Sequence, residues 1–180
     1  MKIDRKSTLT AALLRELLHY DPETGIFTRK VITTNRVKVG DVAGSPNQKG
    51  YINIMVCGRL HPAHRLAWFY VHGVWPKGQI DHINGIRDDN RIANLREATN
   101  SQNKQNMRTA RADNESGLLG VRWHKRDRRW HARIMVDGAP KHIGSFGTSE
   151  EAQAAYMAAK RRLHEFGEIA KEAGSSMSAS

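Results

Sequence analysis

An acid, a histidine and two asparagines follow one another at intervals that suit catalysis. Asp81 and His82 are adjacent, Asn94 comes twelve positions after the histidine, and Asn103 nine positions after that. Histidine can take a proton from water near neutral pH, and carboxylate and amide oxygens suit a hard divalent ion. Such a set can assemble a one-metal centre that cuts phosphodiesters, so the chain is a candidate nuclease.

The charge of the chain points to the same class of partner. Its 180 residues include 29 lysines and arginines against 18 aspartates and glutamates, which gives a formal net charge of +11. A polyanion is the natural partner of such a surface. The alternative is a basic surface that only keeps the protein soluble, and the motifs must decide between the two.

Cysteine usage limits the kinds of metal site. The single cysteine, Cys57, excludes a disulfide framework and a paired-cysteine zinc clip. His61, His64 and His72 could suggest zinc, but they have no cysteine partners. We therefore expect no structural zinc at these histidines.

The first residues carry no pattern of a targeting segment. Residues 1–10 are charged, and the apolar stretch 9–18 is interrupted by Arg15 and Glu16. This predicts neither a signal peptide nor a membrane span. We expect a protein of the cell interior that is not secreted and does not bind a membrane.

Local patterns predict the elements that position the candidate residues. Leucines at helical spacing predict a packing helix over residues 8–19, and alternation predicts a strand over residues 50–56. A short helix is expected over residues 64–71. Residues 79–82 and 95–98 then read as two strands, and Thr99 as the cap of a helix that runs through Asn103 to Met107.

These residues resemble the HNH endonuclease family in its phage homing-type branch. The motifs that carry the resemblance, over about residues 20–106, are His64-Arg65-Leu66-Ala67-Trp68, Asp81-His82-Ile83-Asn84-Gly85, Asp89-Asn90-Arg91 and Asn94-Leu95. The family has a ββα-metal core, here the strand, strand and helix of about residues 78–107.

The resemblance implies a role for each residue. His82 would be the general base for water, Asp81 and Asn103 the metal ligands, and Asn94 the loop brace that orients His82. The implied cofactor is one Mg²⁺ or Mn²⁺ ion per active site, with no small-molecule cofactor. The last letter of the family's name is Asn103 here rather than histidine, which weakens any preference for a transition metal.

Behind a polar stretch, residues 107–116, a second pattern begins. Residues 120–124, 129–136 and 141–146 read as three strands, and residues 149–166 as an amphipathic helix. Strand alternation places one set of apolar residues toward that helix: Val121, Trp123, Trp130, Ala132, Ile134, Val136 and Ile143. The opposite face then carries Arg122, His124, His131, Arg133 and His142, and an arginine-rich sheet face suits the major groove.

This part resembles the AP-two/ERF DNA-binding domain. The match covers about residues 116–170 and rests on Gly120-Val121-Arg122, Arg129-Trp130-His131-Ala132-Arg133-Ile134, Ile143-Gly144-Ser145-Phe146 and the helix start Glu150-Glu151-Ala152. It implies base contacts from Arg122, His124, Arg126, Arg133 and His142. Met135 and Pro140 depart from the family's base-reading positions, so the target sequence does not transfer. Arg108 and Arg111 in the linker could bind phosphates, although a plain solvated connector is equally consistent.

The sequence thus predicts an α+β protein of two domains. The HNH nuclease domain would span residues 1–106, the linker 107–116, the AP-two/ERF-like domain 117–170 and a disordered tail 171–180. The expected function is metal-dependent endonuclease activity on double-stranded DNA, in the host cytoplasm if a phage encodes the protein. The alternatives are a non-catalytic DNA-binding transcriptional regulator derived from such a nuclease, and an RNA-binding protein. The oligomeric state, the target sequence and the biological role are not predicted.

Overall fold

The computed structural model describes residues 8–32, 34, 36–107, 110 and 114–164. The chain forms two compact units, Met1–Ala98 and Thr99–Ser180. The boundary lies eight residues before position 106, so the short helix at residues 100–105 groups with the second unit. The domain bounds expected from the sequence, including the linker and the tail, stay predictions.

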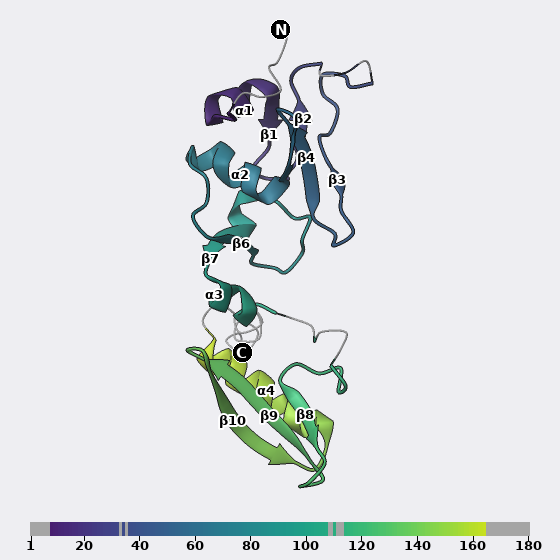
Figure 1. Cartoon of the computed structure of the whole chain (residues 1–180), viewed down its shortest axis with the longest axis vertical. Helices are drawn as coiled ribbons and strands as arrows, with labels where there is room; N and C mark the ends of the chain where they lie inside the picture. Colours follow the sequence, from purple (N-terminus) through teal and green to yellow (C-terminus); the bar gives the residue numbers. More distant parts are fainter. Residues whose placement is uncertain (1–7, 33, 35, 108–109, 111–113, 165–180) are drawn as a thin grey trace, which may run out of the picture. The chain divides into compact units, whose positions relative to one another are not determined.

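The first unit combines two helices with short antiparallel strands (Figure 1). Its elements in chain order are α1 (Ala11–Leu17), β1 (Leu18–Tyr20), β2 (Phe27–Arg29), β3 (Ser45–Pro46), β4 (Ile52–Val56), β5 (Arg59–Pro62), α2 (Ala63–His72), β6 (Gln79–His82), the 3-10 helix η1 (Ile92–Asn94) and β7 (Leu95–Ala98). The strands form the pair β1-β2, the sheet β3-β4-β5 and the pair β6-β7.

The N-terminal helix is shorter than the sequence predicts. The helical spacing of the leucines favours residues 8–19, but α1 begins after its cap Thr10, whose side chain accepts from the Leu13 amide at 3.1 Å. Its end at Leu17 is set by pairing, because Leu18 to Tyr20 form β1 against β2. Tertiary strand pairing thus overrides local helix propensity here. The strand predicted over residues 50–56 and the helix predicted over 64–71 are confirmed as β4 and α2.

The core of the first unit lies between the two helices and the strands. Leu14, Leu18, Ile54 and Leu66 are fully buried in it, and Phe27 is buried beside them. The ring of Phe27 packs against Tyr20 with centroids 4.7 Å apart. This cluster fixes β1, β4 and α2 as one body, on which β6 and β7 rest through the buried Ile80 and Leu95.

The hairpin of β6 and β7 carries the candidate residues. The two strands pair antiparallel, with Asp81 opposite Arg96 and His82 opposite Leu95. The twelve residues between them hold the turn at Gly85, whose amide bonds to the His82 carbonyl at 2.9 Å, and end in η1. After β7, Thr99 caps α3 (Asn100–Gln105) through a capping box with Gln102. The order strand, strand, helix is as predicted, but the helix ends at Gln105 rather than Met107.

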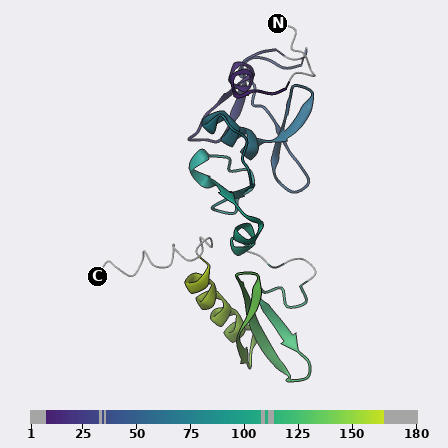
Figure 2. The same ribbon diagram turned by 60° about the vertical axis from the view of Figure 1, so that its left-hand side comes forward.

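The second unit has a three-stranded antiparallel sheet with one long helix. The strands β8 (Val121–His124), β9 (Arg129–Val136) and β10 (Ala139–Phe146) lie in the order β10-β9-β8, and α4 (Ser149–Leu163) covers one face (Figure 2). Val121, Ala132 and Ile134 pack on Ala152 and Tyr156 of the helix. The three strands are confirmed, and the helix ends at Leu163, three residues before the predicted end.

Strand alternation divides the sheet residues as predicted, with one departure. Arg122, Arg133 and His142 are exposed, whereas Val121, Ala132 and Ile134 are buried under α4. Trp123 pairs with Trp130 on the helix side, yet 38% of it is exposed, because β8 is an edge strand. Among the described residues, no helix is long and apolar enough to span a membrane.

Candidate active site

Strand β6 brings the adjacent acid and histidine into the interior. Asp81 and His82 are each only 5% exposed. Removing a carboxylate from water is costly unless a partner compensates its charge. The β6-β7 register supplies that partner, since residues directly opposite in an antiparallel pair share a face.

Arg96 is the residue that compensates Asp81. Its Nε and Nη2 both donate to Oδ2 of Asp81, at 3.0 and 2.8 Å. Charge-assisted hydrogen bonds of this kind are short and directional. The guanidinium therefore fixes the carboxylate through one of its two oxygens.

His82 has a side-chain partner in the following loop. Its Nε2 lies 3.4 Å from Oδ1 of Asn90, and both side chains are buried. The Asn90 amide is oriented by its own Nδ2, which donates to the Asp88 carbonyl at 3.0 Å. An amide oxygen can only accept, so this contact favours the tautomer of His82 that carries its proton on Nε2 and its lone pair on Nδ1.

Burial acts on the protonation of His82. Desolvation lowers the pKa of His82 below its usual range, and the hydrogen bond to Asn90 and the charge of Asp81 oppose this in part. The imidazole is therefore neutral at pH 7, which is the form that can accept a proton.

Asn94 holds the loop between His82 and Asn90. Its Oδ1 accepts from the Asn84 amide at 2.9 Å, and its Nδ2 donates to the Asp89 carbonyl at 2.8 Å. Asp89 in turn accepts from the Asn84 side chain at 2.6 Å. Asn94 thus ties both sides of the loop together, and the His82 ring contacts the side chain of Asn90.

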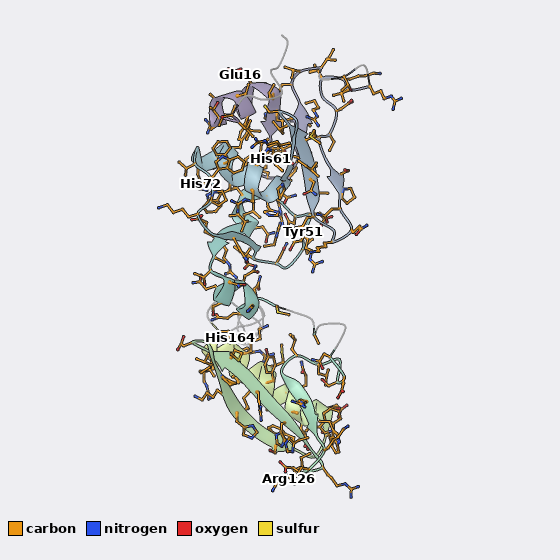
Figure 3. All side chains as sticks on the ribbon, viewed as in Figure 1. Glu16, Tyr51, His61, His72, Arg126 and His164 are labelled. Carbon is orange, nitrogen blue, oxygen red and sulfur yellow. The ribbon has the colours of Figure 1, made fainter. Side chains whose placement is uncertain are left out.

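Two aromatic side chains, His64 and Tyr51, pack against the ring of His82. The ring of His64, on α2, lies edge-on to His82 with centroids 5.2 Å apart, and the ring of Tyr51 lies 5.9 Å from His82. Tyr51, labelled in Figure 3, immediately precedes β4. The Arg87 guanidinium stacks on Tyr51 and donates to the Lys49 carbonyl at 2.8 Å. These contacts hold the loop between β6 and β7 against the β3-β4 hairpin.

The N-terminal hairpin sets the position of Asn90. The Tyr20 hydroxyl donates to the Asn90 carbonyl at 2.8 Å in the interior. Gly25, with φ of +73°, approaches so closely that an added Cβ would lie 2.4 Å from the Arg91 amide nitrogen. Only glycine permits both this φ and this approach, and the β1-β2 turn therefore acts as a template for the loop that holds His82.

Asn103 lies on α3, which belongs to the second unit, and its side chain is half-buried. The structure thus brings together Asp81, His82 and Asn94 within one unit, whereas the joining of Asn103 to them stays a prediction. The donor chemistry fits a hard divalent cation, because a buried carboxylate and an amide provide oxygen ligands only. That Asp81 and Asn103 hold such an ion stays a prediction.

The sheet of the second unit bears the residues expected to contact DNA. Arg122, Arg133 and His142 are exposed on one face, and His142 lies directly opposite Arg133. His124 is half-buried at the end of β8, and Arg126 lies in the turn at the tip of the sheet (Figure 3). Arg108 and Arg111 lie outside the described residues.

The comparisons with known proteins match the sequence of this segment to a family. The HNH endonuclease family model matches residues 61–105, which run from α2 through β6 and β7 to the end of α3. Protein 3.8 of Escherichia phage T7 is 33% identical over 102 residues, which make up 56% of this chain and 83% of that protein. The chain belongs to the HNH endonuclease family. None of the solved structures matches it.

The HNH match ends at residue 105, and so the AP-two/ERF resemblance of the second unit stays a prediction. Asn90 and Arg96 contact the candidate catalytic residues, but neither of them received a role from the sequence. Asn90 lies in the motif Asp89-Asn90-Arg91, but the sequence led us to expect that Asn94 orients His82. No role was expected for Arg96. The register of the two strands was the signal for Arg96, since any pairing that puts His82 opposite Leu95 puts Asp81 opposite Arg96.

Proposed function

We propose that this protein is a metal-dependent endonuclease that hydrolyses phosphodiester bonds in duplex DNA. The observation that carries the proposal is the buried pair of Asp81 and His82, whose partners Arg96 and Asn90 orient both side chains. A buried ionisable pair with dedicated partners is costly to maintain for stability alone. It is the expected feature of a catalytic centre.

His82 would act as the general base. With the proton on Nε2, its Nδ1 accepts a proton from water as the water oxygen attacks phosphorus and the bond from phosphorus to the leaving oxygen breaks. Asn90 supports this step because it selects the tautomer, and Asn94 because it holds the loop. General-base catalysis contributes about 10² to 10⁴ in rate.

Asp81, together with Asn103, would hold one Mg²⁺ or Mn²⁺ ion. The ion supplies positive charge at the phosphate and the leaving oxygen when it is bound. Arg96 would orient the carboxylate through Oδ2. The guanidinium thereby limits the directions in which Asp81 can coordinate.

The second unit would bind and target the DNA, as an AP-two/ERF-like domain. The proposal is supported by the exposed arginines of its outer sheet face and by a net charge of +11 for the chain. Arg122, His124, Arg126, Arg133 and His142 are the proposed contacts. The rival function is a DNA-binding regulator that retains the HNH fold without cutting.

Nicking of supercoiled plasmid separates these functions. The wild-type protein should nick with Mg²⁺ or Mn²⁺ and stop in EDTA, and His82→Ala should nick at least about 100-fold more slowly with nearly unchanged duplex affinity. The matched control is His72→Ala, an exposed histidine at the end of α2, which should nick at the wild-type rate. Absence of nicking by the wild type with either ion would favour the regulator, and wild-type nicking by His82→Ala would remove His82 from the mechanism.

A further inference from the structure

The turn between β8 and β9 gathers three potential metal ligands that the nuclease mechanism does not use. Oδ2 of Asp127 lies 3.1 Å from Nδ1 of His124 and 3.1 Å from Nε2 of His131. The ligand atoms of the three residues all lie within 4.8 Å of one another. All three belong to the second unit.

The hairpin geometry explains why these side chains meet. His124 is opposite Arg129, and His131 is two residues further along β9, so the two histidines are diagonal neighbours on the outer face. Arg128, with φ of +50°, reverses the chain before β9. Asp127, two residues before β9, faces both rings from the turn.

His131 is a nearly buried imidazole whose ring nitrogens are not fully satisfied by hydrogen bonds among the described residues, as expected of a metal ligand without its ion. Its side chain is only 11% exposed. Within the described part of the chain, Nδ1 of His131 has no hydrogen-bond partner, and the contact found for Nε2 is the one with Oδ2 of Asp127, at 3.1 Å. A polar group buried without a hydrogen bond is costly, and a metal ion would satisfy it.

We infer that His124, Asp127 and His131 form a second divalent-metal site, with a preference for zinc-like ions over Mg²⁺. Two imidazole nitrogens and one carboxylate oxygen are the donors that Zn²⁺ and related transition metals select, whereas Mg²⁺ prefers oxygen alone. At metal-ligand distances of about 2.05 Å, tetrahedral ligands are about 3.3 Å apart. The two 3.1 Å contacts are close to this value.

Binding requires one ring to turn. The imidazoles of His124 and His131 are stacked, with centroids 4.4 Å apart and planes within 3° of parallel, so one ion cannot lie in both planes. His124, whose side chain is 38% exposed, has the room to rotate about χ2. Its Nδ1 already accepts from the Asp127 amide at 3.3 Å, which shows that the lone pair is directed into the turn.

The position of the site at the β8-β9 turn suggests that a bound ion stabilises the sheet. The three ligands lie at the turn end of the β8-β9 hairpin and come from both strands and the turn between them, so a bound ion would cross-link the strands that carry Arg122 and Arg133. Three protein ligands also leave a fourth position open, as in zinc sites that bind an exogenous ligand. The surrounding Lys125, Arg126 and Arg128 repel a cation, which makes the affinity lower than that of a buried structural zinc site.

The test uses the whole 180-residue chain with Asp81→Ala, which removes the proposed nuclease ion site. Cobalt, added to the metal-free protein as a spectroscopic substitute for zinc, should give the visible absorption of low-symmetry nitrogen and oxygen coordination, and zinc should displace it at one equivalent. His131→Ala and the isosteric Asp127→Asn should each weaken zinc binding at least about tenfold. His142→Ala is the matched control, since its ring lies against His131 with centroids 5.3 Å apart but outside the ligand set, and it should bind zinc normally.

The same titration followed by thermal unfolding checks the cross-link. Zinc should raise the unfolding temperature of the Asp81→Ala protein and of its His142→Ala derivative, but not of the Asp127→Asn derivative. Circular dichroism of the metal-free variants shows whether each is folded. Zinc affinity unchanged by both His131→Ala and Asp127→Asn, or no zinc binding by the Asp81→Ala protein, overturns the inference, and neither result bears on nicking by the wild type.

Discussion

Arg96 and Asp81 face each other across the β6-β7 ladder, and two hydrogen bonds from the guanidinium converge on one carboxylate oxygen, Oδ2. The guanidinium of Arg96 compensates the negative charge of the Asp81 carboxylate, which is almost completely buried. The same carboxylate is the proposed metal ligand. The arginine and the proposed metal ion would therefore compensate the same negative charge. The effect of removing one on stability should depend on whether the other is present.

The first prediction follows from that shared charge. Arg96→Ala should lower the free energy of unfolding in EDTA by about 3 kcal/mol, because it leaves a buried carboxylate without its cation. Mg²⁺ should restore part of this loss, since a bound ion can replace the charge of the guanidinium. Urea unfolding at increasing Mg²⁺ concentrations measures both effects.

The control for this prediction is Arg91→Ala, which removes a more exposed arginine from its pair with Asp89. A surface pair contributes about 1 kcal/mol or less, and Mg²⁺ should not change the difference from wild type. If Mg²⁺ stabilises the Arg96 variant no more than it stabilises the Arg91 variant, Asp81 is not the metal ligand.

The second prediction concerns the glycine that positions the catalytic loop. Gly25→Ala should reduce both stability and the nicking rate, because its Cβ would meet the backbone of Asn90 and Arg91 at 2.4 to 2.5 Å. The matched control is Gly73→Ala, at nearly the same φ but with nothing within 4 Å of its Cβ. It incurs the strain of a left-handed conformation, about 1 kcal/mol, without the clash.

Chemical denaturation and plasmid nicking of the two glycine variants separate the effect of the Cβ contact from that of the left-handed backbone conformation, which both variants share. Gly25→Ala should lose more stability than Gly73→Ala and should also have a lower turnover number. Equal losses in stability, with equal turnover numbers, would show that the β1-β2 turn does not position the loop.

The sequence predicts the elements that carry the candidate site but only part of its geometry. Local patterns were sufficient to predict the two strands and the helix that follows them, and the motifs that include Asp81, His82 and Asn94 carried the resemblance to the family. The partner of His82 was not predictable in this way. Whether Asn90 or Asn94 reaches the ring depends on how the loop folds over Tyr20 and Gly25, about 70 residues away in sequence.

Where strand pairing competed with local propensity, the sequence was also a poor guide. The leucines of residues 8–19 have helical spacing, yet Leu18 and its neighbours pair with β2. Alternation succeeded in the second unit because one face of its sheet is buried under α4, and this fixes the side on which each residue lies. The cluster at Asp127 was missed because it forms in a turn, where alternation gives no information.

The third prediction uses the protonation of His64. Burial, followed by the charges of His82 and Arg65, lowers the pKa of His64 from 6.5 to about 4. The unfolded chain therefore binds more protons than the folded one between these values, so stability is complete above pH 6.5 and is lost as the pH falls toward 4. The loss due to this residue should be about 3 kcal/mol.

Unfolding of wild type and His64→Gln between pH 7 and 4 measures this contribution. The variant should show a shallower decrease, and His19→Gln, at an exposed position on β1, should follow the wild-type curve. A slope that His64→Gln leaves unchanged would mean that His64 has the same pKa in the folded and the unfolded protein.

The last prediction asks whether the second unit reads sequence or only charge. Arg122 and Arg133 are exposed on the outer face of the sheet, and a guanidinium can bind O6 and N7 of guanine bidentately, which lysine cannot copy. Each of Arg122→Lys and Arg133→Lys should lose about 1–3 kcal/mol on a preferred site selected from random duplexes, and little on random DNA. Arg161→Lys, on the exposed side of α4, is the charge-matched control and should change neither affinity. With both affinities measured at one salt concentration, equal losses on preferred and random duplex for both variants would show that these arginines bind phosphate alone and that the sheet holds DNA without reading it.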